Sequence, residues 1–245
     1  MTPLTGRAND IWVYLAAHPL FWLTATLATY ALAERISRFL GRPPWANPFV
    51  LATALLVALL AATSTNYQTF FDGAQFVHFL LGPATVALAV PLYRNLDHVR
   101  SALLPILLAL FCGSCTAIVS AVLVAEACGV PRVIIASLAP KSVTAAIAMS
   151  IAETWGGIPT LTACLVLLTG IFGALFATPC MNLLRIKDDA ARGFAAGLAA
   201  HGLGTARAFE VSPLAGTFAG IALALNGALT SVLVPVLLPW LMASS

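Results

Sequence analysis

Lys141 is the residue whose setting points most clearly to chemistry. It follows Pro140 and precedes two hydroxyl residues, Ser142 and Thr144, in an apolar stretch that holds no other charge for many residues on either side. A lysine buried in a membrane helix costs about 2.5–3.5 kcal/mol on insertion scales, so such a residue usually has a role or a partner. A helix beginning here would gather free backbone N–H groups, two hydroxyls and an ammonium, which suits an anion. The alternative is a lysine whose ammonium reaches the membrane interface.

A second block of polar residues spans 201–210 and contains two glycines, which allow close backbone approach or a break in a helix. Arginine is suited to bidentate capture of a carboxylate, so Arg207 is a candidate substrate ligand. Its i,i+3 spacing from Glu210 equally allows a structural ion pair, which would take Arg207 away from a substrate. His201 is either a proton-coupling group or a hydrogen-bonded helix contact. The substrate-binding candidates of this block are His201, Gly204, Thr205 and Arg207.

Other kinds of chemistry find little support in the sequence. The four histidines have no mutual metal-ligand spacing, and no phosphate or dinucleotide fingerprint is present, so we expect neither a metal nor a cofactor. On a regular helix the side chains of Lys141 and Ser142 diverge by about 100°, and no nucleophile elbow occurs. We therefore expect a protein that is not an enzyme. The net charge of +3 includes no basic stripe, which disfavours nucleic-acid binding.

The composition predicts an all-α polytopic membrane protein. Of the 245 residues, 60% are hydrophobic and only 9% are charged, against about a quarter charged in soluble domains. One membrane helix uses about 20 apolar residues, so we expect about seven to eight transmembrane helices, some of them Pro- or Gly-broken or re-entrant. Residues 1–18 form an N-terminal segment without the pattern of a cleavable signal, and 19–245 form a single transmembrane domain. This predicts a multi-pass protein of the bacterial cytoplasmic membrane.

Eight apolar runs lie between charged and Pro- or Gly-rich breaks. If all eight crossed the membrane, the basic loops 35–42 and 94–100 would face one side, and the basic loop 185–192 would face the other. This conflicts with the usual bias of Lys and Arg toward the cytoplasm. The runs are 19–40, 46–64, 75–92, 101–125, 133–152, 158–184, 193–210 and 214–241.

The run 133–152, broken at Pro140, is the best candidate for a segment that does not cross. A re-entrant hairpin there would put all three basic loops on the cytoplasmic face. Irregular backbone at membrane depth is tolerated only where it is buried in protein or lines a cavity, so this interpretation also predicts a site near Pro140. A broken helix that does cross is the alternative.

A weak internal similarity involves the same place. Residues 81–90 can be aligned with 138–147 so that Leu, Pro, Val and Ala match in register, which suggests an internal repeat. Transporters built from repeats often place broken helices so that their N-termini point at an anionic substrate. Thr85 aligns with Ser142 and becomes a candidate hydroxyl ligand by symmetry. Chance similarity between two Ala/Val-rich segments is the alternative. Two further patterns, Gly193-x-x-x-Gly197 and Gly216-x-x-x-Gly220, predict close helix packing.

Three ordered motifs make the chain resemble the LrgB/CidB family from about residue 19 to the C-terminus. They are the 80–93 segment around Gly82–Pro83, the PKSVT motif at 140–144 with Gly156-Gly157-Ile158-Pro159, and Arg192-Gly193 followed by the 201–210 block. The resemblance implies a multipass inner-membrane protein that often works with a small holin-like LrgA/CidA partner.

Two functions follow from this resemblance. Members are described as antiholin-like modulators of murein hydrolase activity and autolysis, while plant relatives move glycolate and glycerate, and bacterial relatives are linked to pyruvate uptake. We favour a transporter of small monocarboxylates that affects autolysis, with self-association into a homo-oligomer. The alternative is an antiholin-like structural protein that acts with an LrgA/CidA-like partner and needs no intramembrane cation.

Overall fold

The computed structural model describes residues 19–80, 83, 86–87 and 89–243, and these residues form helices joined by turns and loops, with no strand among them. The expected all-helical class is therefore confirmed. Three apolar helices are long enough to cross a membrane: α8 (Leu103–Ala127), α11 (Pro159–Leu183) and α13 (Pro213–Ala243). The expected total of seven to eight crossings stays a prediction. Residues 1–18 and Thr85 lie outside the described residues, as do several partners in the suggested repeat.

The chain divides into two compact units, 1–87 and 88–245, which are described here separately. In the N-terminal unit, Asn47 caps a helix by accepting from the N–H groups of Phe49 and Val50, at 2.9 and 3.4 Å. Trp22 packs edge-on against Phe70, with ring centroids 5.7 Å apart. The elements of this unit are α2 (Pro19–Phe39), the 3-10 helix η1 (Pro44–Ala46), α3 (Pro48–Ala62) and α4 (Tyr67–Phe79).

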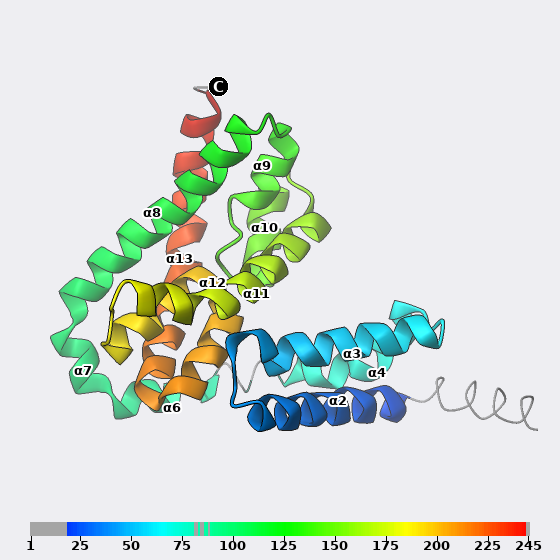
Figure 1. The fold of residues 1–245 in the computed structure, drawn as a ribbon. Coiled ribbons are helices and arrows are strands. Elements are labelled where there is room, and N and C mark those ends of the chain that lie inside the picture. Colours follow the sequence, from blue (N-terminus) through cyan, green and yellow to red (C-terminus); the bar gives the residue numbers. More distant parts are fainter. Residues whose placement is uncertain (1–18, 81–82, 84–85, 88, 244–245) are drawn as a thin grey trace, which may run out of the picture. The chain divides into compact units, whose positions relative to one another are not determined.

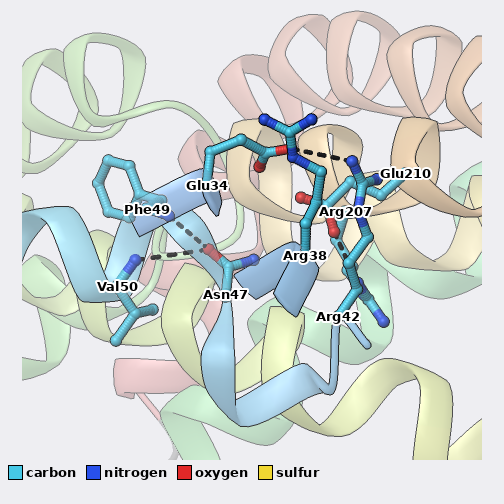
Figure 2. A network of polar contacts seen from close by, with 8 residues as sticks. All are labelled: Glu34, Arg38, Arg42, Asn47, Phe49, Val50, Arg207 and Glu210. Carbon is cyan, nitrogen blue, oxygen red and sulfur yellow. Dashed lines mark hydrogen bonds and ion pairs between the residues drawn. The ribbon is translucent and has the colours of Figure 1, made fainter. Parts of the chain in front are cut away.

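The charged residues that end the first apolar run form a small ion-pair group. Glu34 accepts from Arg38 at 3.3 Å and from Arg42 at 2.9 Å (Figure 2). The chain turns there through two residues with positive φ, Gly41 at 80° and Arg42 at 55°. The helix thus ends at the charged stop that the sequence predicts.

The C-terminal unit contains the three membrane-length helices and two segments that break in the middle. From α8 onward the helical segments begin and end within a few residues of the expected runs, and the predicted break at Pro140 is confirmed, because 139–144 is not helical. The expected run 75–92 does not match, since α4 begins earlier, at Tyr67, and ends at Phe79, and a separate helix covers Ala89–Arg94. Besides α8, α11 and α13, the unit contains α6 (Ala89–Arg94), α7 (Leu96–Ser101), α9 (Arg132–Leu138), α10 (Ala145–Thr154) and α12 (Asp189–Val211).

Residues 132–154 form a helical hairpin, called hairpin 1, that lies beside α13 (Figure 1). α9 runs antiparallel to α13, the loop 139–144 turns the chain, and α10 runs parallel to α13. The N–H of Ile158 then donates to Ser137 Oγ at 2.7 Å, so the chain returns to the level at which α9 ends. The re-entrant course of this segment through the membrane stays a prediction. Three pairs of neighbours trace it: Arg132 with Met242, Ser142 with Asn226, and Ile147 with Gly227, while Trp155 and Pro235 farther on line one cavity.

α12 consists of two helical arms that form a second hairpin, called hairpin 2. Only Ala200 and His201 separate the two arms in the sequence. Ala200 (φ −126°, ψ 17°) and His201 (φ 41°, ψ −129°) leave the helical region and reverse the chain direction. The first arm rises parallel to the beginning of α13, and the second arm returns beside it. Close contacts trace the path: Gly193 with Ala215, Gly197 with Ala219, Gly204 with Ala196, and Phe209 with Gly216.

Two of the basic loops lie at one end of the C-terminal unit. Ala102, just after α7, lines the same groove as Asp188, the N-cap of α12, and Ala190 in its first turn, so the basic segments 94–100 and 185–192 lie near each other. At the other end, Arg132 donates to the carbonyl oxygen of Met242 near the end of α13 at 3.1 Å. Hairpin 1 therefore enters from the end opposite these basic loops, and hairpin 2 enters from the same end as them.

Candidate functional site

Asn226 of α13 holds the tips of the two hairpins together. Its Nδ2 group donates to the carbonyl oxygen of Ser142 in hairpin 1 and to that of Leu198 in hairpin 2, each at 3.1 Å. Its Oδ1 atom accepts from Ser114 Oγ at 2.7 Å and from Thr230 Oγ1 at 3.1 Å. Both hydrogens and both lone pairs of the amide are thus used, in a side chain that is 1% exposed. The two chain breaks therefore meet at one buried amide, which we call the tip junction.

The tip of hairpin 1 presents polar groups that have no acceptor or donor within the fold. Ser142 is 1% exposed, and its Oγ has no hydrogen-bond partner among the described residues. Thr144 is the N-cap of α10 but makes no side-chain capping bond. The N–H groups in the first turn of a helix have no partner within that helix. This tip therefore offers several unused donors beside the half-buried Lys141.

The tip of hairpin 2 is held by His201, which is 7% exposed. His201 Nε2 donates to the carbonyl oxygen of Val166 in α11 at 2.9 Å, and Thr205 Oγ1 donates to the carbonyl oxygen of His201 at 2.9 Å. The tip can approach α11 because Gly173 has no side chain: a Cβ there would lie 2.3 Å from the Cβ of Ala200. The positive φ of His201 is a strained conformation for a residue other than glycine.

The second arm of hairpin 2 also begins at the tip junction. It starts just after His201, so its N-terminus lies close to the N-terminus of α10. A helix N-terminus carries a partial positive charge and unpaired N–H groups, which favour a bound anion. Two such N-termini at one place favour a bound anion, and Lys141 belongs to the tip of hairpin 1 that carries one of them.

Arg207 lies toward the other end of the second arm and is paired with Glu210. Arg207 Nη1 donates to Glu210 Oε2 at 2.6 Å, and the two side chains are only 12% and 17% exposed (Figure 2). Six residues of helix separate Arg207 from His201, a rise of about 9 Å. The ion pair suggested by the i,i+3 spacing is therefore present, at some distance from the tip junction. Arg207 and Arg192 line the same small space, of about 20 Å³.

The described candidate residues from the sequence thus separate into four groups. Pro140, Lys141, Ser142 and Thr144 form the tip of hairpin 1, and His201 and Thr205 hold the tip of hairpin 2. Gly204 serves close packing, because a Cβ there would lie 2.1 Å from the carbonyl oxygen of Ala196. Arg207 belongs to the ion pair with Glu210.

Asn226, Ser114 and Thr230 are central to this arrangement, and the sequence analysis missed them. The signal was a single amide within an otherwise apolar run of α13. A polar side chain in a membrane helix needs a hydrogen-bond partner, and that reasoning applies to asparagine as it does to charged residues. Among the residues that the structure describes, no three His, Cys, Asp or Glu side chains are grouped to hold a metal ion.

Comparisons with known proteins place the chain among membrane proteins of one family. The model of the LrgB-like family matches residues 26–240. The chain is 34% identical to the uncharacterised protein YwbG of Bacillus subtilis, over 89% of this chain and 97% of that protein. It is 30% identical to the antiholin-like protein LrgB of Bacillus mycoides, over 91% of this chain and 97% of that protein. No solved structure matches the chain.

Proposed function

The chain belongs to the LrgB-like family, and we propose that it transports small monocarboxylates such as glycolate, glycerate or pyruvate across the bacterial cytoplasmic membrane. The observation that carries the proposal is the tip junction, where two chain breaks from opposite ends of the C-terminal unit meet at Asn226. Irregular backbone inside a membrane is tolerated where it is buried or lines a site, and transporters place their substrates at such breaks.

The groups at the tip of hairpin 1 suit a carboxylate better than a neutral solute. A carboxylate accepts up to about four hydrogen bonds, and the tip offers the Ser142 hydroxyl and the first N–H groups of α10. The Lys141 ammonium supplies the opposite charge that offsets the loss of hydration. We assign substrate binding to Lys141, Ser142 and Thr144, with His201 and Thr205 holding the facing tip.

In this proposal, Arg207 has a structural role rather than a direct contact with the substrate. Its guanidinium pairs with Glu210 in a largely buried setting, and the pair stabilises the second arm of hairpin 2. Freeing the arginine for a substrate would leave the Glu210 carboxylate buried without its counter-charge, which is costly.

Uptake by the purified protein in proteoliposomes tests this function. A panel of short 2-hydroxy and 2-oxo acids is offered with and without a proton gradient, and we expect saturable uptake of at least one of them. Lys141→Ala should abolish that uptake, whereas Lys187→Ala, at an exposed loop position, should leave it intact. Full uptake by the Lys141→Ala variant would rule out the assigned site, and no uptake of any acid by the parent protein would rule out the transporter.

The second candidate function is an antiholin-like structural role, which the names of several relatives favour. Here the chain would act on autolysis by packing against other copies or against an LrgA/CidA-like membrane partner. Such a role needs packing surfaces and no cation at the tip junction. It predicts that changes at the packing glycines alter autolysis while Lys141→Ala does not. A transporter that affects lysis through metabolite flux predicts that both changes alter it.

A further inference from the structure

A cavity of about 520 Å³ lies between α10 of hairpin 1 and the C-terminal half of α13. Its walls carry three hydroxyl side chains, and none of its lining residues is charged. The residues that define it are Ile147, Ser150, Thr154, Trp155, Ser231 and Pro235. The cavity is large enough for a short carboxylic acid with several water molecules, since each water takes about 30 Å³ of liquid volume.

The floor of this cavity lies next to the tip junction. Ala146 and Ile147, at the start of α10, line the end of the cavity that is nearest in sequence to Ser142. Gly227, which follows Asn226, contacts Ile147: a Cβ on Gly227 would lie 2.9 Å from Ile147 Cδ1. Ile147, which lines the cavity, therefore packs against the residue that follows the buried amide joining the two tips.

The mouth of the cavity lies toward the end of the unit at which hairpin 1 enters. Trp155 and Pro235 line this part, and α13 continues from there to Met242, beside Arg132. The basic loops 94–100 and 185–192 lie at the opposite end. Because basic loops favour the cytoplasmic side, we expect the mouth to face the outside of the cell.

The exposed side of α10 is poorly suited to lipid. Ala146, Ser150 and Thr154 lie on one exposed side of this helix at i, i+4 and i+8. In α13, Ser231 contributes another hydroxyl to the same cavity, with its Oγ donating to the carbonyl oxygen of Gly227 at 2.9 Å. A stripe of small and hydroxyl side chains gains little from hydrocarbon contact, whereas water satisfies the remaining lone pairs of these hydroxyls.

We propose that this cavity is the aqueous vestibule by which a short carboxylate reaches the tip junction from the outer face, with Ile147 against Gly227 as its floor. The proposal rests on the proposed transport function and adds the route and the side of access. Ser150 and Ser231 line the route, and Ile147 closes it from the tip of hairpin 1 in this conformation.

Cysteine accessibility tests the vestibule. The five native cysteines are first replaced by serine or alanine, and Ser150→Cys, Ser231→Cys and Val232→Cys are then made separately in the full chain. Intact cells are treated with sulfonatoethyl methanethiosulfonate, an anion that does not cross membranes. Val232 is the matched control, because it neighbours Ser231 and is 62% exposed but does not line the cavity.

We expect Ser150→Cys and Ser231→Cys to react at least about tenfold faster than Val232→Cys, because the reactive thiolate requires water. Glycolate, or whichever acid the parent transports, should slow this reaction, and modification should block uptake. Equal labelling of all three positions, labelling without an effect on uptake, or reaction only in inverted vesicles would each overturn the vestibule.

The two proposals fail in different ways. If the cysteine-free parent takes up a carboxylate but neither vestibule cysteine reacts from outside, the route is wrong and the transport function stands. If the vestibule cysteines react but the parent transports no carboxylate, the transport function is wrong, and with it the assignment of this cavity as a carboxylate route. Ala146→Cys, one helical turn before Ser150 in the same cavity lining, provides a second position if one serine variant does not fold.

Discussion

Asn226 Nδ2 donates to the carbonyl oxygen of Ser142 at 3.1 Å and thereby fixes a non-helical loop of hairpin 1 to the middle of α13. The orientation of this amide is determined by its surroundings, since two hydroxyl groups donate to Oδ1 and two carbonyl groups accept from Nδ2. Rotating the amide by 180° would set its oxygen against both carbonyls. One side chain therefore sets the positions of both hairpin tips.

Replacing Asn226 by aspartate should uncouple the tips. Asn226→Asp keeps the size of the side chain but removes both N–H donors and sets a carboxylate oxygen against the carbonyl groups of Ser142 and Leu198. We expect the free energy of unfolding to fall by about 1–3 kcal/mol or more, as for a buried polar group left unsatisfied. Thermal unfolding in detergent measures this change.

Asn182→Asp is the matched control, because it makes the same chemical change where Asn182 Oδ1 accepts from Arg192 Nη2 at 2.9 Å. There the new carboxylate keeps the acceptor and gains an opposite charge. Equal loss of stability in the two variants would contradict the central role of Asn226.

Ser142→Ala should separate binding from stability. Because Ser142 Oγ has no partner among the described residues, its removal should leave the melting temperature unchanged or slightly higher. The KM for the carboxylate should rise about tenfold, the effect of losing about 1.4 kcal/mol of binding. Uptake kinetics in proteoliposomes and thermal unfolding measure the two effects.

Ser137→Ala should have the opposite effects, lowering stability without changing the KM. Ser137 Oγ accepts from the N–H of Ile158 at 2.7 Å, so the variant leaves a backbone donor without its partner. We expect a loss of about 1–3 kcal/mol in stability, with KM unchanged. A higher KM for Ser137→Ala than for Ser142→Ala would count against the assignment of Ser142 to the substrate.

The two breaks in the chain differ in how far the sequence could predict them. Proline removes a backbone donor, so Pro140 marks the break in hairpin 1. In hairpin 2 the nearby glycines suggested a break, but the reversal falls on Ala200 and His201, because neighbouring helices hold His201 in its strained conformation. Gly204 instead allows the two arms to approach each other.

The pairing of the two tips could not be predicted, because it depends on contacts far apart in the sequence. Ser142 and Leu198 meet only through Asn226, which lies 84 residues from the first and 28 from the second. The scarcity of charged residues drew attention to Arg207. The sequence alone could not decide whether Arg207 forms an ion pair or binds a substrate. The structure shows the ion pair with Glu210.

Paired substitutions distinguish the roles of Arg207. Arg207→Ala should destabilise the protein by about 3–5 kcal/mol, because it leaves a buried carboxylate without its counter-charge. Replacing both residues, as Arg207→Met with Glu210→Leu, should recover most of this loss. If Arg207 is structural, the double variant should also regain uptake. A stable double variant without uptake would indicate that Arg207 contacts the substrate directly.

His201→Gly should be more stable than His201→Ala. Both variants lose the hydrogen bond to the carbonyl oxygen of Val166. Only glycine adopts φ near 41° without a steric cost, and relief of that strain is worth about 1–3 kcal/mol. Thermal unfolding of both variants measures the difference. Because both lack the same hydrogen bond, the difference in stability reports the backbone strain alone. Equal stability would mean that position 201 is not held in this conformation.

Glycine substitutions test whether the close approach of hairpin 2 to α13 is required. In the Gly193-x-x-x-Gly197 pattern, a Cβ at Gly197 would lie 2.1 Å from the carbonyl oxygen of Ala219, so Gly197→Ala must displace a helix. We expect a loss of about 1–3 kcal/mol. Gly220 belongs to the other pattern, but a Cβ there meets nothing within 4 Å, so this member does not serve close packing.

Gly220→Ala is therefore the control, and it should stabilise α13 by about 0.5–1 kcal/mol through the helix preference of alanine. Both variants make the same chemical change, so their opposite signs isolate the effect of packing from that of helix propensity. If both stabilised the protein, hairpin 2 would have to lie farther from α13 than the structure places it. The Leu198 carbonyl would then be out of reach of Asn226, and the tip junction would lose one of its two sides.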